Sequence, residues 1–204
     1  MINKKFKTSI LYDYLKLINK SNEDIKEFII ELFNETPDYF WTLLASTSKT
    51  HHGVSELLID HVNQCCHIMA YKVWPQMQAY WDNRTKDLAL AGMLVHDNWR
   101  CGYPGKESFY TKDIIDSKGY PKEILGTLMT NIEHAKIGGD IIDTKLNSKK
   151  YPEDFRIIAD AVRYHYGPWG PNIDLSSIPY ISPIIQVHNV DFHQTNNAEL
   201  NHIF

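Results

Sequence analysis

Apolar residues recur at steps of three and four positions along almost the whole chain, and this periodicity is the feature that most limits its fold. One face of an α-helix produces such a spacing, whereas a half-buried strand alternates polar and apolar residues. No stretch of useful length alternates in that way. The pattern therefore predicts an all-α protein without a sheet.

The segment 85–99, TKDLALAGMLVHDNW, is the most apolar of the expected helices, and we expect it at the centre of the fold. We divide the chain into a helical N-terminal extension, residues 1–40, and one helical domain, residues 41–204. The first expected helix covers residues 6–20, and a second opens at Ser21 and buries Ile25, Phe28, Ile29 and Phe33. Further helices are expected over 37–46, 54–74, 85–99, 122–134 and 152–166, and a last one from Pro183. The helix over 122–134 is expected to continue or restart over 135–146.

Composition excludes several classes of protein. The chain has 204 residues, of which 43% are hydrophobic and 23% charged, as in ordinary globular proteins. A net charge of −4 counts against broad non-specific binding of nucleic acids, which depends on excess Lys and Arg. No apolar run approaches the roughly 20 residues that span a bilayer. Three cysteines make no secreted-type disulfide framework, and polar residues interrupt the start of the chain, so we expect a cytoplasmic protein.

Metal-ligand residue types fall on successive expected helices. Neutral imidazoles and carboxylates together favour divalent transition metals. Burying the adjacent His96 and Asp97 beside the apolar run LALAGMLV without a partner would cost several kcal/mol, so this pair requires a metal or an ion partner. The residues of this type are His61, His96, Asp97, His134, His165 and Asp191.

The order and spacing of these residues resemble the HD-domain metal-dependent phosphohydrolase superfamily, whose motif runs His, His-Asp, two further His in some members, then Asp. The resemblance covers roughly residues 40–195 and implies an HD-domain-like helical bundle that holds two divalent metals. It implies one metal held by His61, His96, Asp97 and Asp191, and a second held by His134 and His165 with Asp97 as the bridge. Iron, manganese, cobalt, nickel and zinc all suit such ligands.

Two local runs extend the resemblance. HDNWRCG, residues 96–102, is similar to the HDxxKxG run of several HD families, with Arg100 as the cation that faces the substrate phosphate. ASTSKTHHG, residues 45–53, is similar to the AS-x-x-GK-x-H loop of one subgroup, with Ser48 in the place of glycine and Lys49 as a phosphate contact. The alternatives are that Arg100 pairs with a surface carboxylate and that Lys49 is a solvated loop lysine.

The resemblance implies Asp97, Arg100 and Lys49 as catalytic residues. Substrate contacts are expected from Ser48, Lys49, Arg100, Tyr166 and Trp169, the last two by stacking on a base, although an aromatic beside Gly-Pro also serves as a packing plug. His188, three residues before Asp191, is expected to orient that carboxylate, and His67 should not share the metal face of its helix.

The expected activity is hydrolysis of a phosphoester or phosphoanhydride bond of a small nucleotide through a metal-activated water. A cyclic nucleotide or cyclic oligonucleotide phosphodiesterase and a non-catalytic metal- or nucleotide-binding regulator are the alternatives, with nucleic-acid cleavage a weaker one. The expected partner is a small phosphorylated substrate and not a membrane. The aromatic residues of the N-terminal extension favour a homodimer contact there.

Overall fold

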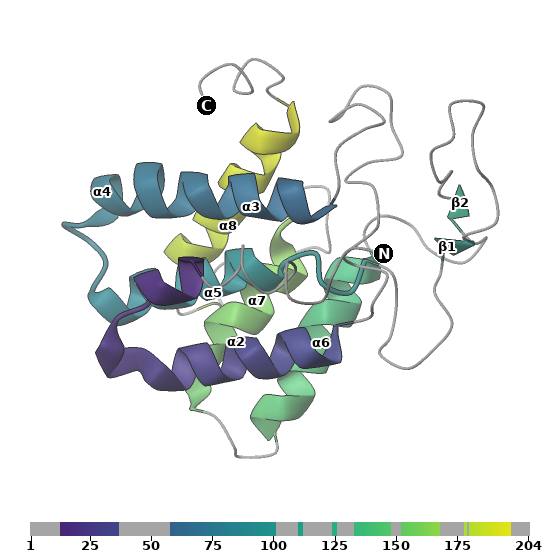
Figure 1. The fold of residues 1–204 in the computed structure, drawn as a ribbon, viewed down its shortest axis with the longest axis horizontal. Coiled ribbons are helices and arrows are strands. Elements are labelled where there is room, and N and C mark those ends of the chain that lie inside the picture. The colour runs from purple at the N-terminus through teal and green to yellow at the C-terminus, as the bar shows by residue number, and fades with distance from the viewer. Residues whose placement is uncertain are drawn as a thin grey trace.

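The computed structural model describes residues 13–36, 58–100, 110–111, 124–125, 133–147, 152–167, 178 and 180–196. Helices dominate these residues, and the chain forms an all-α bundle (Figure 1). Its elements are η1 (Lys20–Asn22), α2 (Glu23–Glu35), α3 (Leu58–Ile68), the π-helical η4 (Met69–Val73), α4 (Trp74–Met77), α5 (Asn83–Val95), β1 (Tyr110–Thr111), β2 (Ile124–Leu125), α6 (Glu133–Asn147), η5 (Glu153–Phe155), α7 (Arg156–Tyr164) and α8 (Ile181–Asn196).

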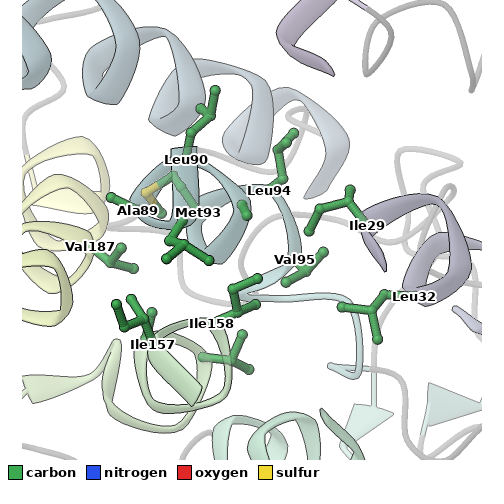
Figure 2. Close-up of a cluster of buried hydrophobic side chains, with 14 of the residues drawn as sticks. Ile29, Leu32, Ala89, Leu90, Met93, Leu94, Val95, Ile157, Ile158 and Val187 are labelled. Carbon is green, nitrogen blue, oxygen red and sulfur yellow. The ribbon is translucent and has the colours of Figure 1, made fainter. Parts of the chain in front are cut away.

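α5 is the central helix of the bundle, as its apolar sequence predicts. It packs against α2, α3, α7 and α8, so neighbours cover it on every side. All residues from 87 to 95 are buried. Figure 2 shows the apolar side chains of α5 among Ile29 of α2, Ile158 of α7 and Val187 of α8. The turn that follows α5 is thereby placed inside the protein.

α7 approaches both α5 and α6 closely, because glycines line the crossings. A Cβ added to Gly92 would lie 2.7 Å from the Cβ of Ala161, and one added to Gly138 would lie 2.6 Å from Cγ1 of Val162. Side-chain atoms do not approach one another so closely, so α5 and α6 present bare backbone to α7 at these points. The crossings fix the position of both helices on α7.

Residues 13–36, part of the expected N-terminal extension, share one core with the rest of the bundle. The ring of Phe28 stacks on that of Phe155, with 4.9 Å between centroids. Arg84 of α5 pairs with Asp24 of α2 at 2.8 Å. The boundary between an extension and a domain stays a prediction, and the helix expected over residues 37–46 lies outside the described residues.

Two predictions of secondary structure are wrong. β1 and β2 form a two-residue antiparallel ladder where no strand is expected. Ile124 and Leu125 belong to β2, within the segment 122–134 whose apolar spacing predicts a helix. α6 spans Glu133–Asn147, so His134 lies within a helix that continues beyond it instead of closing one. Pairing across the strands takes precedence here over local spacing, as tertiary contacts often do.

Helices occur near the positions expected for 54–74, 85–99, 135–146, 152–166 and the segment from Pro183. Of the helix expected over 6–20, residues 13–17 are helical and residues 6–12 lie outside the described residues. The segment 54–74 corresponds to α3, η4 and α4, which form one continuous rod in Figure 1. α7 ends just before His165, and α8 begins two residues before Pro183. None of the helices in the described part of the chain is long and apolar enough to cross a membrane.

Gly138→Ala tests the close packing of α6 on α7. Alanine is a better helix former than glycine by about 1 kcal/mol, but an extra methyl in a filled core costs about 1–3 kcal/mol. This methyl would meet Val162 at 2.6 Å and the Trp99 ring at 2.8 Å. We therefore expect a lower midpoint of urea unfolding. Thr144→Ala, at an exposed position of the same helix, should not lower it. A midpoint that rises in Gly138→Ala would contradict the packing described here.

Candidate metal centre

Six metal-ligand side chains from five helical segments meet inside the bundle. They are the six that the sequence predicts as ligands, and all are buried except Asp191, whose side chain is 17% exposed. Their places are His61 in α3, His96 and Asp97 directly after α5, His134 in α6, His165 at the end of α7, and Asp191 in α8.

The first group of ligand atoms gathers around Nε2 of His61. This nitrogen lies 3.2 Å from Nε2 of His96, 3.1 Å from Oδ1 of Asp191 and 3.6 Å from Oδ2 of Asp97. The Nε2 atom of His96 lies 3.6 Å from Oδ2 of Asp97 and 3.7 Å from Oδ1 of Asp191. Two imidazole nitrogens and two carboxylates thus face one point.

The second group lies on the other side of the Asp97 carboxylate. Its Oδ1 atom is 2.9 Å from Nε2 of His134 and 3.5 Å from Nε2 of His165. The two imidazole nitrogens are 3.3 Å apart. Asp97 therefore directs one oxygen at each group, which is the arrangement of a carboxylate that bridges two cations.

Helix ends orient two of the histidines. The last carbonyls of a helix have no intrahelical partner, and Nδ1 of His96 lies 2.7 Å from the Met93 carbonyl while Nδ1 of His165 lies 2.7 Å from that of Val162. Nδ1 must donate its proton to a carbonyl, so in the neutral form of each ring the lone pair is on Nε2 and faces the cluster. Such support of the other ring nitrogen is typical of metal-binding histidines.

The distances fit a metal site. With metal–ligand bonds of about 2.1 Å, ligand atoms lie about 3.0 Å apart in an octahedron and about 3.4 Å apart in a tetrahedron. The separations within the two groups run from 2.9 Å to 3.7 Å. Two imidazole lone pairs as close as those of His61 and His96 repel each other unless a proton or a metal lies between them. The buried groups could therefore hold a metal ion.

Electrostatics also favours a cation. Every ion-pair partner that the described residues offer to Asp97 and Asp191 is a histidine. Burial would raise the pKa of both carboxyls, but the facing imidazoles outweigh it and hold both below their usual range. Burial would likewise lower the pKa of His96, but the two carboxylates raise it to about 9. Burial does lower the pKa of His165, to about 4. The first group thus attracts positive charge. A divalent cation brings two positive charges to this point, whereas a proton brings one.

Cys65 is a neighbour of the first group that the sequence analysis missed. It lies one turn after His61 on α3, and its sulfur is within 4.8 Å of ligand atoms of His61, His96 and Asp191. The sulfur is 3.7 Å from Nε2 and 3.8 Å from Nδ1 of His61. Because it is equally far from both nitrogens, it lies beside the ring, away from the lone pair of Nε2. A metal on that lone pair would be well outside the about 2.3 Å of a zinc–sulfur bond, so Cys65 forms a wall of the site.

Gln194 of α8 is a second residue that the sequence analysis missed. It is buried, and its Oε1 atom lies 2.5 Å from Nδ1 of His61. Its spacing of three residues from the predicted ligand Asp191 places both on one face of α8, which is the signal that could have found it.

The predicted substrate residues are placed in part. Arg100 is buried in the turn after α5, three residues beyond Asp97. The ring of Tyr166 contacts those of His134 and His165, with centroids 5.4 Å and 4.7 Å apart. Its position beside the second group agrees with its expected place at the site. The other predicted contacts, Ser48, Lys49 and Trp169, lie outside the described residues.

Two further histidines lie outside both groups of ligand atoms. His188 contacts the carbonyl of His165 through Nδ1 at 2.7 Å, so it supports the end of α7. The orientation of Asp191 by His188 stays a prediction. The ring of His67 contacts that of Tyr71 at a tilt of 45°, with 4.7 Å between centroids, in agreement with its expected place away from the metal face.

Metal-stripped protein should unfold at a higher temperature when Mn²⁺ or Co²⁺ is added. A ligand at 100 times its dissociation constant stabilises the folded state by about 2.7 kcal/mol. His96→Ala removes a ligand and should abolish most of this shift in thermal midpoint, whereas His67→Ala should keep it. An equal shift in the wild type and in His96→Ala would show that the metal binds elsewhere.

No family model matches the chain, and no curated protein or solved structure does so either.

Proposed function

We propose that this protein is a metal-dependent phosphohydrolase of the HD type that hydrolyses a phosphoester or phosphoanhydride bond of a small nucleotide. The observation that carries the proposal is the position of Asp97, whose two oxygens face two separate groups of histidines. The chain order of the six ligands, with an adjacent His-Asp pair after an apolar helix, supports the same reaction class.

Two divalent ions fit this arrangement. The first would be held by His61, His96, Asp191 and one oxygen of Asp97, and the second by the other oxygen together with the second group. Iron, manganese, cobalt, nickel or zinc would suit the ligands. When bound, such ions lower the pKa of a water molecule and offset negative charge on phosphoryl oxygens.

The chain contributes pre-oriented groups. The imidazoles of His96 and His165 are fixed through Nδ1, so their Nε2 lone pairs need no reorganisation during the reaction. Burial of the cluster keeps bulk water from screening its charges. Asp97, central to both groups, holds them at a constant separation.

Phosphate and base contacts complete the proposal. Arg100 follows Asp97 within the same turn, and its guanidinium would bind the phosphate through two N–H groups. Lys49 and Ser48 would contact the phosphate from their loop. Tyr166, whose ring contacts those of His134 and His165, would stack on the base, as would Trp169. A cytoplasmic location and a homodimer through the N-terminal segment stay predictions.

The test is product analysis after the protein is incubated with nucleotides and cyclic nucleotides in Mn²⁺, and again after anaerobic loading with iron. The wild type should hydrolyse one group of these compounds, releasing phosphate, pyrophosphate or triphosphate. Asp97→Ala should lower the activity by at least about 100-fold. Loss of a residue that only supports a metal ligand costs up to about 100-fold, so loss of the bridging ligand should cost at least as much. Asp13→Ala, which removes an exposed carboxylate, is the matched control.

The outcomes separate the alternatives. Opening of a cyclic nucleotide would identify a phosphodiesterase. If Asp97→Ala keeps more than about a tenth of the activity, the bridging role is contradicted, because so small a loss is typical of a residue that only supports a ligand. Failure of the wild type to turn over any compound with either metal would favour a non-catalytic metal- or nucleotide-binding regulator.

A further inference from the structure

The orientation of His61 cannot be secured in the way that secures His96 and His165. Those two residues follow the ends of helices, where carbonyls are free to accept from Nδ1. His61 lies inside α3, where the carbonyls of residues 58–60 are bonded to N–H groups further along the helix. Its ring therefore needs an acceptor from another element of the fold.

α8 provides that acceptor and a second contact as well. Oε1 of Gln194 lies 2.5 Å from Nδ1 of His61, and Oδ1 of Asp191 lies 3.1 Å from Nε2 of the same ring. The two residues are three positions apart on one helix, so α8 contacts both nitrogens of one imidazole. The ring cannot rotate without losing one of these contacts.

A second amide fixes the direction of the first. Nε2 of Gln194 donates to Oε1 of Gln64 at 2.6 Å, and Gln64 lies one turn after His61 on α3. With its amide nitrogen occupied by this bond, Gln194 presents its oxygen to His61. Nδ1 of His61 must then carry the proton, which leaves the lone pair on Nε2, the atom that faces the first group.

We propose that Gln194 is a positioning residue that fixes the tautomer and orientation of His61 and thereby sets the metal affinity of the first group. The proposal rests on the metal site proposed above. Loss of such a contact to a metal-binding histidine costs about 10- to 100-fold in metal affinity.

The test compares Gln194→Met with Gln194→Glu. Methionine fills a similar volume but accepts no strong hydrogen bond, and glutamate accepts the Nδ1 proton at least as well as glutamine. The affinity for Co²⁺ is measured by competition with a chelator. The ion of interest is the one held by the first group, identified as the ion that His61→Ala no longer binds. Unfolding of the metal-free proteins in urea is measured in parallel. Gln186→Met, the same change elsewhere on α8, is the matched control.

Gln194→Met should weaken Co²⁺ binding about 10- to 100-fold, while Gln194→Glu and Gln186→Met should bind like the wild type or tighter. The metal-free Gln194→Glu protein should be less stable in urea than the wild type, because glutamate buries a charge. In a His61→Ala background, Gln194→Met should cause no further loss of metal binding. Normal affinity in Gln194→Met, or weak binding in Gln194→Glu, would overturn the proposal.

This design separates the inference from the proposed function. A wild-type protein that binds no Co²⁺ would overturn both. Tight binding that does not depend on Gln194 would overturn the inference alone and would leave the hydrolytic reaction standing. Turnover of nucleotides enters neither measurement.

Discussion

The interaction on which the site depends is the contact of one carboxylate with two groups of histidines. Asp97 is buried, yet its pKa lies well below the usual range, because imidazoles face both of its oxygens. A carboxylate in such a place would be costly without compensating charge. The cluster is stable only if the positive charge that it requires is present as protons or as metal ions. The fold therefore creates a buried site that favours the binding of cations.

The bundle supplies the geometry that this carboxylate needs. α5 is covered on all sides and ends in the interior, so the turn that carries His96 and Asp97 is held by the core. α7 also ends at the cluster, and its free carbonyls orient His165 as those of α5 orient His96. Close crossings at Gly92 and Gly138 bring the backbones together. Small shifts of these helices would change the separations of the ligand atoms, which now match the ligand–ligand distances of octahedral or tetrahedral metal coordination.

Much of this architecture could be predicted from the sequence. The spacing of apolar residues predicts the helices. Residue type and order point to the six candidate ligands, because few other reasons bring a buried His-Asp pair and three more histidines into apolar helices. β2 could not be predicted, since its two residues also fit a helical pattern and only pairing with β1 decides between the two. Gln194 has no chemical signature of its own. Its spacing of three residues from Asp191 places it on the same face of α8, but its contact with His61 follows from the meeting of α8 with α3, which no local pattern encodes.

The most direct test of the account is the number of metal ions per chain, measured by elemental analysis after the protein is loaded with Mn²⁺ or Co²⁺ and freed of excess metal. Two ions per chain are expected, with one remaining in His134→Ala, because that change removes a ligand of the second group only. A single ion in the wild type, or two ions retained in His134→Ala, would contradict the claim that Asp97 joins two metal sites.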